Sequence, residues 1–79
     1  MMTYTELYAQ YESCIEIQNK IISKCREDYM AAIKKGNHNK SEALGRILKT
    51  YYDERNDLVT SANEMKKYVE AENQTDMVS

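Results

Sequence analysis

Apolar side chains recur at intervals of three and four residues along the first half of the chain. This stripe comprises Tyr4, Leu7, Tyr8, Tyr11, Cys14, Ile15, Ile21, Ile22, Cys25, Tyr29, Ala32 and Ile33. The period places these side chains on one face of an α-helix. Thr3 followed by Glu6 fits a capping box at the start of the helix, and Gly36 suits the left-handed residue that often follows a helix end. The pattern predicts a helix over about residues 3–35.

A second, thinner stripe follows a short polar stretch. It comprises Leu44, Ile47, Leu48, Tyr51, Leu58, Ala62, Met65, Tyr68 and Val69. Asn39, with Glu42 three residues later, is the predicted N-cap of this helix, and Ser41 is the competing cap. The period then fades. We therefore expect a second helix over about residues 40–72 and a disordered C-terminal tail over residues 73–79.

Because the connection between the two helices is only a few residues long, they are expected to fold back antiparallel. The predicted fold is therefore all-α, with residues 1–72 forming a single helical-hairpin domain. The tyrosines near the ends of the two helices should gather at the open end of the hairpin. They are Tyr4, Tyr8, Tyr11 and Tyr68.

Composition supports long helices in a small domain. The chain has 79 residues, no proline and only two glycines, and 30% of its residues are charged. The longest apolar run, residues 29–33, is far shorter than the ~20 residues that span a bilayer. The N-terminus lacks the basic and apolar segments of a secretory signal, and two cysteines do not make a disulfide framework. We expect a cytoplasmic protein without a membrane partner.

The stripes are wider than the seam that two helices share, so a lone hairpin would leave apolar surface in water. We therefore expect a second chain, either another copy that completes a four-helix bundle or a different helical protein. The predicted function is a non-enzymatic protein–protein interaction module of unknown biological process. The interface is expected to include Leu7, Tyr11, Ile15, Gln18, Ile22, Tyr29, Tyr51, Arg55, Leu58 and Met65.

Gln18 and Arg55 are the polar members of that set. In the hairpin they should lie about one turn apart, at the level where both stripes are interrupted. Two interpretations are open. Polar side chains buried among apolar ones fix the register and the choice of partner in coiled coils. Alternatively, both side chains extend to solvent from the edge of the stripe.

Charge is distributed unevenly along the chain. Residues 1–19 carry three acidic and no basic residues, residues 20–49 have a net charge of +5, and residues 50–79 have a net charge of −4. The turn end of the hairpin should be basic and the open end acidic. Basic residues near the turn are candidates for nucleic-acid contact: Lys34, Lys35, Lys40, Arg46 and Lys49. Ordinary solvated helix faces, or a head-to-tail contact between basic and acidic ends, are the alternatives.

No pattern of catalytic, cofactor-binding or metal-binding residues is present. Cys14 and Cys25 share a helix face about 16 Å apart by helix geometry. They therefore serve either as small apolar residues or in bonds between antiparallel first helices of two chains. His38 is the only histidine. Since phosphate-binding loops and nucleophile–base pairs are also absent from the sequence, we expect neither an enzyme nor a small-molecule substrate.

Overall fold

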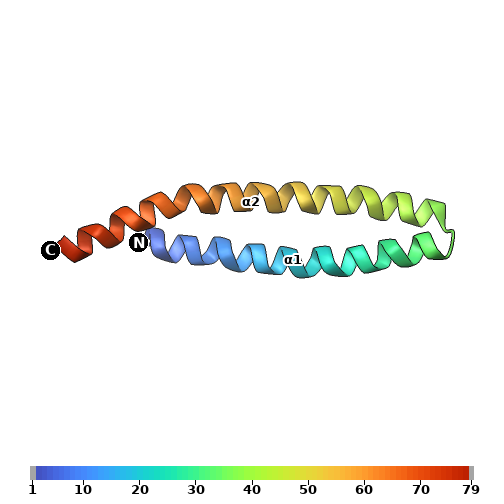
Figure 1. The fold of residues 1–79 in the computed structure, drawn as a ribbon, viewed down its shortest axis with the longest axis horizontal. Coiled ribbons are helices and arrows are strands. Elements are labelled where there is room, and N and C mark those ends of the chain that lie inside the picture. The colour runs from blue at the N-terminus through green and yellow to red at the C-terminus, as the bar shows by residue number, and fades with distance from the viewer. Residues whose placement is uncertain (1, 79) are drawn as a thin grey trace.

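The computed structural model describes the backbone of residues 2–78 and the side chains of residues 2–73. Over these residues the chain forms two helices, α1 (Tyr4–Lys34) and α2 (His38–Val78). The helices run antiparallel and side by side, and the end of α2 projects beyond the start of α1 (Figure 1). The predicted all-α hairpin is confirmed. Its dimensions are 63 × 19 × 15 Å.

Helix α1 begins at the predicted cap. Thr3 has an extended backbone, and its side-chain oxygen accepts a hydrogen bond from the Glu6 amide at 3.1 Å. This bond satisfies one of the first-turn amides, which have no acceptor within the helix. The Leu7 amide donates to the Thr3 carbonyl at 3.0 Å and begins the regular ladder. Glu6 also places a negative charge at the positive end of the helix dipole.

The end of α1 is a Schellman motif. Gly36 has a φ of +71°, as predicted for the residue after the helix. The Asn37 amide donates to the Ala32 carbonyl and the Gly36 amide to the Ile33 carbonyl, both at 3.0 Å. These two bonds satisfy carbonyls that a helix end leaves without donors. The motif reverses the chain within three residues, so α2 starts at once alongside α1.

The predicted N-cap of α2, Asn39, is wrong. Asn37 caps the helix instead: its side-chain oxygen accepts from the Lys40 amide at 3.2 Å, and its carbonyl accepts from the Ser41 amide at 3.0 Å. Asn37 can do this because the Schellman bond already holds its backbone at the turn. The helix therefore begins at His38, two residues before the predicted start.

Helix α2 also ends later than predicted. Its backbone is helical through Val78, six residues beyond the expected end at residue 72. The last glycine of the chain is Gly45 and there is no proline, so no residue breaks the helix after the apolar period fades. Within the predicted disordered tail, residues 73–79, the backbone of residue 79 and the side chains of residues 74–79 lie outside the described part.

Few side chains are fully shielded by the packing of the two helices. The buried residues within the described part are Ile22, Cys25, Ala32, Leu48 and Ala62. Three of these form one cluster, against which partly buried side chains pack. The cluster is Ile22, Cys25 and Leu48, and the surrounding side chains are Tyr29, Leu44, Tyr51 and Tyr52. The core therefore lies mainly between the middle of the hairpin and the turn.

The hairpin is extended for its mass. Its radius of gyration is 18.0 Å, against about 11.6 Å for a compact domain of this length. Its accessible surface is 6288 Å², roughly 1,300 Å² more than a compact monomer of 9.3 kDa exposes. Over the described residues, neither helix has an apolar stretch long enough to cross a membrane.

Candidate interaction surface

The ten residues predicted to contact a partner lie along the seam between α1 and α2. Ile22 is buried, and the other nine are partly buried. These nine are Leu7, Tyr11, Ile15, Gln18, Tyr29, Tyr51, Arg55, Leu58 and Met65. Because the hairpin uses these side chains to join its own helices, only part of each remains accessible to another chain.

A different set of large apolar side chains faces solvent. These residues are Met2, Tyr4, Ile17, Ile21, Met30, Ile33, Ile47, Val59 and Tyr68. The most exposed isoleucine is Ile17, at 57%. None of the nine belongs to the predicted interface, although five of them are members of the two stripes: Tyr4, Ile21, Ile33, Ile47 and Tyr68. Two of them lie beside the seam: Ile17 and Ile21 are one turn apart on α1 and precede the seam residues Gln18 and Ile22 in the sequence.

A groove that we call the central groove lies between the two helices. It encloses about 390 Å³ and is lined by Lys20, Ile21, Lys24, Cys25, Asp28, Ile47 and Tyr51. Ile21 from α1 and Ile47 from α2 are 38% and 43% exposed within it. On its rim, Lys24 forms an exposed ion pair with Asp28 at 3.3 Å. The groove therefore has an apolar floor and a charged rim.

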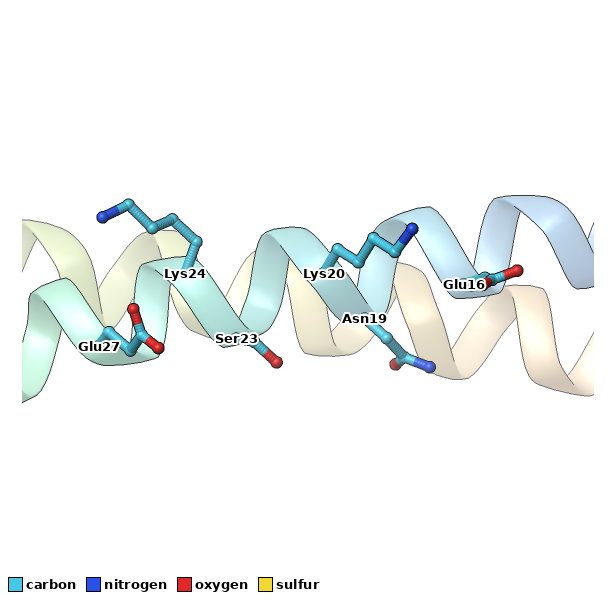
Figure 2. A pocket seen from close by; sticks show the side chains of 6 residues that line it. All are labelled: Glu16, Asn19, Lys20, Ser23, Lys24 and Glu27. Carbon is cyan, nitrogen blue, oxygen red and sulfur yellow. The ribbon is translucent and has the colours of Figure 1, made fainter.

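The outer face of α1 carries two further depressions. Figure 2 shows the first, which is lined by Glu16, Asn19, Lys20, Ser23, Lys24 and Glu27. The second lies nearer the turn, encloses about 560 Å³ and contains Met30 and Ile33. Each is lined by side chains of one helix only. These two depressions and the central groove are all open to solvent, unlike the concave, enclosed sites that hold small molecules.

A layer of polar side chains crosses the seam near the middle of the hairpin. The Gln18 amide donates to Glu54 Oε2 at 3.0 Å and to the Tyr51 carbonyl at 3.4 Å. Arg55 donates to Asn19 Oδ1 at 3.1 Å, and its guanidinium lies 5.0 Å from the centre of the Tyr52 ring. Gln18 and Arg55 thus bond partners other than each other.

These polar contacts were missed because their partners are not adjacent in sequence. Asn19 and Glu54 carry no local signal that would pair them with Arg55 and Gln18. The bonds join α1 to α2 within one chain, so they help to fix the register of the hairpin. Asn19 and Glu54, at the edges of the polar layer, are exposed.

The basic side chains predicted near the turn are all exposed. Lys34 and Lys35 end α1, and Lys40, Arg46 and Lys49 lie on the first three turns of α2. The structure therefore gathers all five at one end of the molecule, together with His38, which is also exposed. We call this end, residues 34–49, the tip. The basic side chains of the tip are separate charges on its surface.

Over residues 2–73, the cysteine and acidic side chains form no metal site. Among the described residues, no group of three or more histidine, cysteine or carboxylate side chains is arranged to hold an ion. Cys14 is exposed and Cys25 is buried, and both are free thiols. At the open end, a hydrogen bond with Glu12 is the main cause that raises the pKa of Tyr8 above 10.0.

Comparison with known proteins found no match to a protein-family model, to a curated protein or to a solved structure. The interpretation of the surface therefore depends on its exposed side chains and their arrangement.

Proposed function

We propose that this protein is a non-enzymatic protein–protein interaction module that works as a dimer of helical hairpins. The observation that carries this proposal is the balance of buried and exposed apolar residues. Five residues of the described part are buried, whereas nine large apolar side chains are exposed. A surface of this kind is typical of a chain whose apolar residues are covered by another helical chain.

The size of the exposed surface supports the same conclusion. A specific interface of ordinary size buries about 800 Å² on each partner. The excess of roughly 1,300 Å² over a compact monomer is large enough to supply such an interface. A second hairpin laid along the first would cover exposed isoleucines from both helices. Two-fold dimers are also the commonest assemblies of soluble proteins.

The test is to place charges in the central groove. Ile21→Glu combined with Ile47→Glu leaves the core cluster intact, because both side chains are exposed in the single hairpin. We expect the mass measured by light scattering to fall from that of a dimer to that of a monomer. Ser23→Glu, on the outer face of α1, is the matched control and should leave the mass unchanged. A wild-type chain that is already monomeric would contradict the proposal.

A second candidate function is nucleic-acid binding by the tip. The observation that favours it is the exposure of five basic side chains at one end of the rod. Phosphate contacts weaken steeply with salt, so binding would be strongest at about 50 mM salt. The test is fluorescence anisotropy with generic RNA and DNA, using a variant with Lys34, Lys35 and Lys40 changed to Glu. Absence of binding at low salt would exclude this function.

A further inference from the structure

We infer that two copies of this chain dock antiparallel, with the first half of α1 of each chain against the central groove of the other, so that the tip of each lies beside the open end of the other. The open end is where the first turn of α1 meets Glu72 of α2. The inference rests on the proposed dimer and adds its docking face and direction. Three features of the hairpin support it: its charge distribution, the position of its exposed isoleucines and the character of one flank of α1.

Charge favours the antiparallel arrangement. Residues 20–49, which include the tip, have a net charge of +5, whereas residues 1–19 and 50–79 carry −3 and −4. Two hairpins docked in the same direction would place basic tip beside basic tip and acidic end beside acidic end. The opposite direction brings unlike charges together at both ends of the dimer. Complementary charge of this kind selects orientation more strongly than it raises affinity.

The exposed isoleucines lie where an antiparallel dimer needs them. Ile17 and Ile21 are placed symmetrically about residue 19, the middle of α1 (Tyr4–Lys34). A two-fold axis through this point brings Ile17 of one chain opposite Ile21 of the other. It also allows the two α1 helices to overlap along their full length. Both isoleucines therefore gain a partner, and Ile47 covers the next part of the groove toward the tip.

Toward the open end, the line of α1 side chains on the groove side carries no charged residue. In a two-helix coil, residues seven apart lie on one line along the helix. The line through Ile21 toward the open end contains Cys14 and Leu7, and neither is charged. Over the same half of α1, the line on the other side of the seam contains Glu12 and Asn19. Over this half of α1, a second chain therefore meets a less charged line of side chains on the groove side.

Disulfide trapping distinguishes the two directions. With the axis at residue 19, Cys14 of one chain lies opposite Lys24 of the other. The test protein carries Lys24→Cys and Cys25→Ala, so that Cys14 is the only native thiol. If Cys25→Ala lowers helicity, Cys25→Val replaces it and fills the buried space. Oxidation with diamide is followed by peptide mass mapping, and the mass of the unoxidised protein is measured in parallel.

We expect a covalent dimer linked from Cys14 to the cysteine introduced by Lys24→Cys. The matched control carries Glu27→Cys in place of Lys24→Cys, together with Cys25→Ala. Glu27 projects from α1 in a different direction from Lys24 (Figure 2). This control should give little covalent dimer. A dimer linked from Cys14 to Cys14, or one that forms no link, would overturn the antiparallel groove inference and leave the proposed function standing. A monomer before oxidation would overturn both.

Discussion

The two ends of the hairpin are held together by different interactions. Toward the turn, Ile22, Cys25 and Leu48 form a buried cluster, and a Schellman motif joins the helices within three residues. At the open end, exposed polar and aromatic groups make contacts beside partly buried seam residues such as Leu7 and Met65. Tyr4 stacks on Tyr68 with ring centres 5.1 Å apart.

Glu72 completes the contacts of the open end. Its carboxylate accepts hydrogen bonds from the Tyr4 amide at 3.0 Å and from the Thr5 hydroxyl at 3.1 Å. Exposed hydrogen bonds of this kind contribute little net stability because bonds to water readily replace them. Burial of apolar side chains stabilises the folded chain because it removes apolar surface from water. The interactions that contribute most to the free energy of unfolding of the single hairpin are therefore expected near the turn. Local opening should therefore begin at the open end.

The largest effect should come from a charge placed in the buried cluster. Ile22 is 4% exposed, so Ile22→Asp buries a carboxylate without a partner. We expect loss of cooperative unfolding in far-ultraviolet circular dichroism, with dissociation of the assembly. Tyr4→Asp, at the open end, is the comparison and should leave most of the helix content. Full helicity and an unchanged mass for Ile22→Asp would show that the cluster does not hold the fold.

Truncation of one apolar side chain near each end should lower the free energy of unfolding by different amounts. Leu48→Ala removes a buried side chain and should lower the free energy of unfolding by about 2–4 kcal/mol. Tyr68→Ala removes an exposed ring and its stacking, and should cost about 0.5–1.5 kcal/mol. Urea unfolding at one protein concentration measures both values. Equal losses would mean that the two ends contribute alike.

The two glycines should respond to alanine with opposite signs. Gly36 has a left-handed backbone, so Gly36→Ala should destabilise the turn by about 1–2 kcal/mol. Gly45 lies inside α2, and an added methyl group would meet the Tyr29 ring at an ordinary contact distance of 3.5 Å. Gly45→Ala should therefore stabilise the protein by about 0.5–1 kcal/mol. Thermal unfolding of both variants checks the signs, and destabilisation by Gly45→Ala would indicate tighter packing at Tyr29.

Neutralising Glu72 should have a smaller and local effect. Glu72→Gln weakens the bonds to the Tyr4 amide and the Thr5 hydroxyl, and exposed interactions of this kind contribute about 0–1 kcal/mol. Hydrogen exchange at the Tyr4 amide should become faster. Amides of the Ile22 region should keep their exchange rates. Faster exchange at both ends would mean that the hairpin opens as one unit.

The smallest effect concerns Tyr8. Its hydrogen bond with Glu12 raises its pKa above 10.0 because the bond favours the neutral phenol. The stabilisation is therefore fully present below pH 10 and is lost as the pH rises through the folded-state pKa. Glu12→Gln should lower the pKa of Tyr8, as measured by NMR titration of its ring carbons. An unchanged value would show that Glu12 is not the cause.

The hairpin, its first cap and its turn glycine could be predicted because each has a local signal. The period of three and four identifies a helix face, and Thr3 and Gly36 stand where caps belong. The cap of α2 was missed because Asn37, Asn39 and Ser41 are all suitable capping residues. Only the geometry of the Schellman motif decides among them.

The candidate surface was harder to predict. Because each stripe is wider than the seam, it contains more apolar side chains than one facing helix can cover. It does not show which of them the second helix takes. The residues chosen from the stripe, such as Tyr29 and Leu58, lie in the seam, whereas Ile17 and Ile21 beside it remain exposed. The role of Glu72 depends on residues 67 and 68 positions away, beyond the reach of any local pattern.

Sedimentation equilibrium of the unaltered chain tests the central claim most directly, because it measures mass without assuming which residues lie in the interface. The account predicts a species of twice 9.3 kDa at micromolar concentration, in equilibrium with monomer on dilution. A folded chain that sediments at 9.3 kDa over that whole range would contradict it.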